Sequence, residues 1–215
     1  MMNSVSAPSL WQSTLEQFRE KVASRDPSVA AVAVAAVSAS CALNLVVMVL
    51  EITANRKNFQ GDRHRLDALV EAALAESERL ARYADEDPAA YAKYVRCLRM
   101  PKNTEEERAA RDHAIAGALR RATEVPLAAA NAALAGLNIC AQAVEIAHGA
   151  VATDLGGAAM LLAGAARAVL LSVDANLEAL GETEFRDQVA AERGELEERA
   201  VRQSNSVRKR IADNR

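Results

Sequence analysis

Apolar residues recur along most of the chain at the spacing of α-helix faces, and short polar stretches interrupt the pattern. The predicted helices cover about residues 9–25, 29–55, 62–83, 87–100, 104–147 and 153–180. A charged segment follows from Glu182, and we expect residues 1–8 and 203–215 to be frayed tails. The pattern therefore predicts long helices that pack side by side.

Local start signals set several of these boundaries. Asp87-Pro88 predicts a helix start, because Asp is a favoured N-cap and Pro fits the first helical position. Thr104 opens the sequence TEEE, which matches a capping box. Thr153 or Asp154 is expected to cap the next helix.

The stretch VAAVAVAAVSASCALNLVVMVL, residues 29–50, carries no charge over 22 residues. Its length allows a membrane span. About a third of it is Ala, it contains Ser38, Ser40 and Asn44, and no aromatic residue flanks it. A helix that is apolar on all sides also suits the centre of a bundle, so we expect this helix to be buried in protein rather than in lipid.

Composition supports an all-α fold. Aromatic residues make up 3% of the chain, only five prolines interrupt it, and alanine is abundant, as is typical of long helices in close contact. Pro126 lies inside a predicted helix, so a kink near Thr123 is expected. We predict a single domain, residues 1–215, built as a bundle of long, partly kinked antiparallel helices.

Charge and metal-binding patterns exclude several function classes. The net charge is -3, which argues against a nucleic-acid partner. The three cysteines and three histidines show no CxxC or HExxH spacing, so neither a disulfide framework nor a metal site is expected. Free thiols suit the cytoplasm, and MMNSVSAPSLWQSTLEQF has no signal-peptide pattern.

A more specific pattern spans residues 87–127, DPAAYAKYVRCLRMPKNTEEERAARDHAIAGALRRATEVPL. The segments MPKNT and VPL, at this separation, resemble motifs of the cyclodeaminase/cyclohydrolase family. Weaker matches extend the resemblance over nearly the whole chain, through VVMVLEITANRKNF at 46–59, Thr153-Asp154, SVDANL at 172–177 and Phe185.

The resemblance implies a helical homodimer that acts on one-carbon units of tetrahydrofolate without a metal or other cofactor. Members close formimino-tetrahydrofolate to the methenyl form or hydrolyse the methenyl form. By this resemblance Asp87 is the catalytic acid/base. The residues implied in substrate binding are Asp154, Asn176, Lys57, Arg56 and Thr53.

Structural interpretations of the same residues remain open. Asp87 and Asp154 could serve as helix caps, Asn176 could pack between helices, and Arg56 and Lys57 could be solvent-exposed. The family's glycine triad is replaced by Ala30-Ala31-Val32, and Val and Ala tolerate close backbone approach less well than Gly. Two alternatives to the folate enzyme follow: an inactive binding or structural subunit, and an enzyme acting on another one-carbon carrier.

Overall fold

The computed structural model describes residues 9–27, 29–147, 149–181 and 183–213. Within these residues the secondary structure is entirely helical, which confirms the all-α prediction. The elements are η1 (Leu10–Gln12), α1 (Leu15–Val22), α2 (Ala31–Ala54), α3 (Arg63–Leu98), α4 (Glu105–Ala143), η2 (Gly149–Val151), α5 (Ala152–Ala179) and α6 (Glu184–Asp213).

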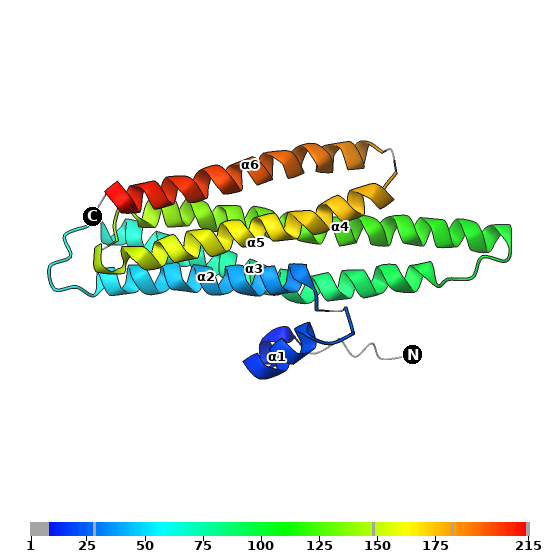
Figure 1. Ribbon diagram of the computed structural model, residues 1–215, viewed down its shortest axis with the longest axis horizontal. Helices are drawn as coiled ribbons and strands as arrows, with labels where there is room; N and C mark the ends of the chain where they lie inside the picture. The colour runs from blue at the N-terminus through cyan, green and yellow to red at the C-terminus, as the bar shows by residue number, and fades with distance from the viewer. Residues whose placement is uncertain (1–8, 28, 148, 182, 214–215) are drawn as a thin grey trace.

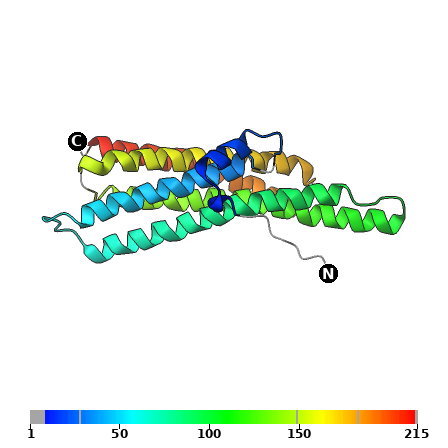
Figure 2. The same ribbon diagram turned by 90° about the horizontal axis from the view of Figure 1, so that it is seen from below.

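Helices α2 to α5 run alternately up and down and enclose the apolar core (Figure 1). Helix α6 lies along α4 and α5. The α3–α4 hairpin extends beyond the other helices at one end, and α1 lies outside the bundle (Figures 1 and 2). We call the end of the bundle that carries the α2–α3 connection the closed end. At the opposite end α2 begins, while α3 and α4 continue beyond it.

Helix α2 contains most of the uncharged stretch, and it packs in the bundle as expected. Its polar groups find partners there: Ser40 and Ser77 share a hydrogen bond of 2.8 Å, and Asn44 Nδ2 donates to Ser77 Oγ at 2.9 Å. By length and composition alone, α2, α4 and α5 could each cross a membrane. The most apolar windows of these helices are 56%, 61% and 50% buried within the bundle.

The predicted boundary at Asp87 is wrong, because α3 is one continuous helix with Pro88 inside it. A proline inside a helix costs about 3 kcal/mol. The residues beyond it offset this cost by packing on α4: Ala90 and Cys97 are buried, and Arg111 donates to the Leu98 carbonyl at 3.3 Å. Asp87 is therefore not a helix cap, and that interpretation is excluded.

The predicted start of α5 and the predicted end of α6 are also wrong. Helix α5 begins at Ala152 after Val151, so neither Thr153 nor Asp154 is its N-cap, and Asp154 lies in its first turn. A carboxylate there is still favourable, because the helix dipole is positive at that end.

Helix α6 continues to Asp213, where we expected fraying from residue 203. Val207 and Ile211 are buried against the bundle, and Arg210 donates to the Ala141 carbonyl and to Glu145. These contacts hold the last turns in place. The other predicted tail, residues 1–8, lies outside the described residues.

Candidate active site

Asp87 continues the core-facing row of α3. The buried residues of this row recur at helical spacing: Leu66, Leu69, Ala73, Ser77, Leu80 and Ala84. Asp87 is the next position at that spacing, so its carboxyl group faces the end of the core. It is half-buried and makes no hydrogen bond or ion pair with another described residue. Burial raises its pKa from 3.8 to about 6.

The two acidic neighbours of Asp87 have different surroundings. Glu86 is at the surface and pairs with Arg121 of α4. Asp85 accepts hydrogen bonds from Ser9 Oγ at 2.6 Å and from the Leu10 amide at 2.7 Å, which fixes the segment before α1 to α3. Within this acidic run, Asp87 is thus the carboxyl group that pairs with no other described residue.

The start of α2 lies at the level of Asp87. The Ser40–Ser77 hydrogen bond sets the antiparallel register of α2 and α3. Ala30 precedes Ser40 by ten residues and Asp87 follows Ser77 by ten, so the two residues lie at about the same level of the bundle. Ala30 is the N-cap of α2 and provides no side-chain hydrogen bond, so the first-turn amides have no side-chain acceptor at the cap. The segment that replaces the glycine triad therefore lies at the same level as the candidate acid/base.

Asn176 of α5 reaches the same level from the other side of the bundle. Its Nδ2 donates to the Ala122 carbonyl of α4 at 2.9 Å. Pro126 has no N–H to donate to that carbonyl, so Asn176 supplies the missing donor. Ala122 is next to Arg121, the partner of Glu86, and Asn176 is therefore level with Asp87. The structure supports the packing role of Asn176, and its role in substrate binding stays a prediction.

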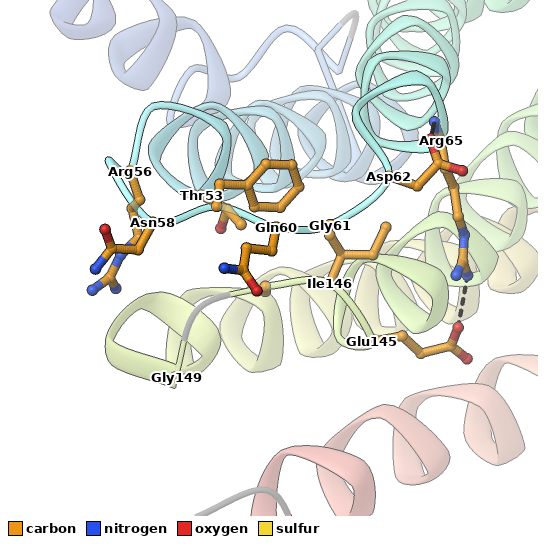
Figure 3. A pocket seen from close by; sticks show the side chains of 12 residues that line it. Thr53, Arg56, Asn58, Gln60, Gly61, Asp62, Arg65, Glu145, Ile146 and Gly149 are labelled. Atoms are coloured by element: carbon orange, nitrogen blue, oxygen red, sulfur yellow. Dashed lines mark hydrogen bonds and ion pairs between the residues drawn. The ribbon is translucent and has the colours of Figure 1, made fainter.

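Thr53 and Arg56 lie at the closed end of the bundle, where they line a cavity of about 480 Å³ (Figure 3). The Thr53 hydroxyl is buried and donates to the Val49 carbonyl at 2.8 Å. Arg56 is exposed and makes no ion pair with another described residue, and the same holds for Lys57 beside it. Arg56 and Lys57 are thus available to an anionic ligand.

The wall of this cavity contains groups that the sequence did not reveal. Arg65 Nη2 donates to Glu145 Oε2 at 2.6 Å, and this contact holds the pKa of Glu145 below its usual value (Figure 3). Phe59 packs so closely over Gly61 that a Cβ there would lie 2.6 Å from the ring. Arg65 and Glu145 are 80 positions apart, so no local pattern could have predicted their contact.

Within one chain, the predicted site residues form two groups rather than one. Asp87 and Asn176 lie where α2 begins, whereas the cavity with Thr53 and Arg56 lies at the closed end. Between Arg65 at the cavity and Asp87, α3 rises about 33 Å, since each helical residue adds about 1.5 Å. Asp154, in the first turn of α5, belongs to the closed end. One reacting carbon cannot contact both groups of a single chain.

Comparison with known proteins gives consistent matches. The model of the family described as formiminotransferase-cyclodeaminase matches residues 14–195. A methenyltetrahydrofolate cyclohydrolase of Methylorubrum extorquens is 28% identical over 86% of this chain and 93% of its own length. The formimidoyltransferase-cyclodeaminase of Sus scrofa is 30% identical over 70% of this chain, which corresponds to 30% of that longer protein.

The fold also has a solved counterpart. The crystal structure of a formiminotetrahydrofolate cyclodeaminase from Thermotoga maritima superposes with a TM-score of 0.84. The match covers 94% of this chain and 98% of the other, at 23% identity. At this identity the likeness shows the helical fold.

Proposed function

Since the chain belongs to the formiminotransferase-cyclodeaminase family, we propose that it is an enzyme of one-carbon folate metabolism. Its reaction would be the cyclodeamination of formimino-tetrahydrofolate or the hydrolysis of methenyl-tetrahydrofolate. The observation that carries the proposal is Asp87, a half-buried carboxyl group that makes no hydrogen bond or ion pair with another described residue and whose pKa is raised to about 6.

The chemistry requires a group that exchanges protons near neutral pH. Both reactions pass through a tetrahedral carbon between two nitrogens. In cyclodeamination the amino group leaves as ammonia after it gains a proton, and in hydrolysis the attacking water loses one. A carboxyl group with a pKa near 6 can do either, because it is present in both forms at neutral pH. Once ionised, Asp87 also stabilises the cationic methenyl ring. The proposal includes no metal ion or other cofactor.

The remaining predicted residues have proposed binding roles. Arg56 and Lys57 carry positive charges that form no ion pair with the described residues, and these charges suit the carboxylates of the folate glutamate tail. Thr53 lines the same cavity. Asp154, at the same end, and Asn176, with its Oδ1 free of hydrogen bonds from the described residues, are proposed to contact the folate.

The rest of the functional assignment follows from the same family. We propose that the protein is a cytoplasmic homodimer that binds a small-molecule folate and neither nucleic acid nor membrane. The net charge of -3 supports the absence of a nucleic-acid partner.

A catalytically inactive family member is the second candidate function. The observation that favours it is the segment Ala30-Ala31-Val32 at the level of Asp87, where the family motif has glycines. Side chains there narrow the space for a ligand. An enzyme for another one-carbon carrier would fit the same change. Titration of the protein with a tetrahydrofolate separates the main proposal from these alternatives, because the absence of saturable binding at millimolar ligand favours the inactive member or an enzyme with another ligand.

The test of the main proposal is an absorbance assay. Purified protein should remove methenyl-tetrahydrofolate faster than buffer, or form it from the formimino compound. Asp87→Asn should lower the rate by about 10²–10⁴-fold, the usual contribution of an acid/base. Glu86→Gln is the matched control on the same helix and should keep the rate, because Glu86 faces solvent and Arg121. Equal rates for Asp87→Asn and the wild type would refute the role of Asp87.

A further inference from the structure

A second cavity, of about 520 Å³, lies where α4 passes the connection between α5 and α6. Helix α4 continues past this connection, so the ends of α5 and α6 form a corner with its side (Figure 1). A volume of this size can hold a small organic molecule. The residues that line the cavity include none of the predicted site residues, so the cavity calls for an explanation of its own.

The inside of this cavity is mainly apolar. Ala116 and Gly117 of α4 form a floor of small residues. A Cβ at Gly117 would meet no atom within 4 Å, so a ligand could approach the backbone of α4 closely there. The other apolar lining residues are Ile115, Leu119, Leu180 and Phe185. A flat aromatic ring suits a small-residue floor beside apolar and aromatic side chains.

Two polar side chains lie at the ends of the floor. His113 and Arg120 are seven residues apart on α4, which places them on one face of the helix and about 10 Å apart along its axis. The Arg120 guanidinium lies over the Phe185 ring, 4.2 Å from its centroid, and its Nε donates to Glu124 at 2.9 Å. These two contacts hold the guanidinium in place, and its Nη groups donate to no other described residue.

We propose that this cavity binds a small aromatic carboxylate, whose ring lies on Ala116 and Gly117 and whose carboxylate accepts hydrogen bonds from the Arg120 Nη groups. A guanidinium that is already oriented can donate two parallel hydrogen bonds to a carboxylate. The lining also contains Asp112, which pairs with Arg111 at 3.6 Å, so its repulsion of an anion is reduced.

The position of the cavity links it to the Asp87 level of the bundle. Leu180 follows Asn176 by four residues on α5, and Arg120 precedes Ala122 by two residues on α4. A ligand in the cavity would therefore contact the two helix segments that the Asn176–Ala122 hydrogen bond joins.

NMR of isoleucine δ1-methyl groups tests the location of the ligand. The chain has five isoleucines, and Ile115 is the one among them that lines this cavity. The intact labelled protein is titrated with 2-naphthoate, and Ile115→Val assigns the signal. The Ile115 signal should shift saturably, whereas that of Ile52, which is exposed on α2, should not. No shift of Ile115 at millimolar 2-naphthoate, or a shift of equal size at Ile52, would overturn the proposal.

A pair of glycine substitutions tests whether the ligand occupies the cavity. Gly117→Leu adds a side chain at the floor and should weaken binding of 2-naphthoate at least about tenfold, measured by calorimetry. Gly157→Leu is the matched control, because Gly157 is also exposed on a helix, has open space at its Cβ position and lies outside the cavity. It should bind as the wild type does. Equal affinities of the two variants would contradict the proposed position.

The neutral analogue 2-naphthamide tests the role of Arg120. The wild type should bind the carboxylate about tenfold more tightly than the amide, because a charge-assisted hydrogen bond is stronger than a neutral one. Arg120→Gln should remove this preference and leave the affinity for the amide nearly unchanged. A wild type without the preference, or a variant that retains it, would refute the contact with Arg120.

Two sources of ligand share this chemistry: a free aromatic acid and the benzoyl-glutamate part of a folate. Competition with 5-formyl-tetrahydrofolate distinguishes them. Displacement of 2-naphthoate from Ile115 would support the folate as the ligand, whereas simultaneous binding would support a separate aromatic acid. The titrations require no turnover, so their result is independent of the proposed function.

Discussion

The substitution Asp87→Asn should make the protein more stable while it removes activity. Burial raises the pKa of Asp87 from 3.8 to about 6, so the folded chain binds this proton more tightly than the unfolded chain. Ionising the group therefore lowers stability as pH rises between these two values. At pH 7 the full cost applies, and the rise in pKa corresponds to at most about 3 kcal/mol of unfolding free energy. A neutral Asn avoids that cost.

The assay is urea unfolding followed by circular dichroism at pH 4 and pH 7, at one protomer concentration so that oligomer formation does not bias the comparison. Asp87→Asn should gain up to about 3 kcal/mol at pH 7 and little at pH 4, where Asp87 is largely protonated when folded. Glu86→Gln should change stability by less than about 1 kcal/mol, since exposed ion pairs contribute little. A gain of equal size at both pH values, or no gain at pH 7, would show that burial of the ionised Asp87 does not destabilise the fold.

Three further predictions concern the same end of the bundle and the core beside it. Asn176→Leu leaves the Ala122 carbonyl without its donor and should lower the unfolding free energy by about 1–3 kcal/mol, measured by urea unfolding. Gly136→Ala places a Cβ 3.0 Å from Leu43 Cδ2 and should cost about 1–3 kcal/mol, seen as a lower melting temperature. The pH–rate profile should change slope near pH 6: the rate rises with pH if Asp87 acts as a base on water and falls if it acts as an acid towards ammonia, and a flat profile would contradict either role.

Sequence patterns predicted the helices well where packing and local signals agree. The apolar spacing gave α2 and α4 to within a few residues, and the TEEE capping box marks the start of α4. The Asp87-Pro88 signal led to a wrong prediction of a helix start, because it reflects only local preferences. The contacts that keep α3 continuous come from α4. Similarly, α6 remains helical to Asp213 because its last turns pack on the bundle.

The candidate site was predictable only in part. Asp87 and Asn176 were identified by resemblance, and the structure places them at one level of the bundle, but no pattern indicated that Asn176 would compensate for Pro126. The separation of Asp87 from Arg56 was also hidden, because it depends on α3 being a single long helix. The sequence indicates which chemical groups are present, whereas the distances between these groups depend on how the helices fold and pack.

The proposed chemistry requires that Asp87 exchanges a proton near neutral pH. The most direct measurement is a ¹³C NMR titration of the aspartate side-chain carboxyl groups in the intact protein, with Asp87→Asn to assign the signal. We predict that one carboxyl signal titrates with a pKa of about 6 and is absent from the variant. An Asp87 signal that titrates near the ordinary value of 3.8 would contradict the proposed role of Asp87, since the group would then be fully ionised at neutral pH and could not serve as the acid.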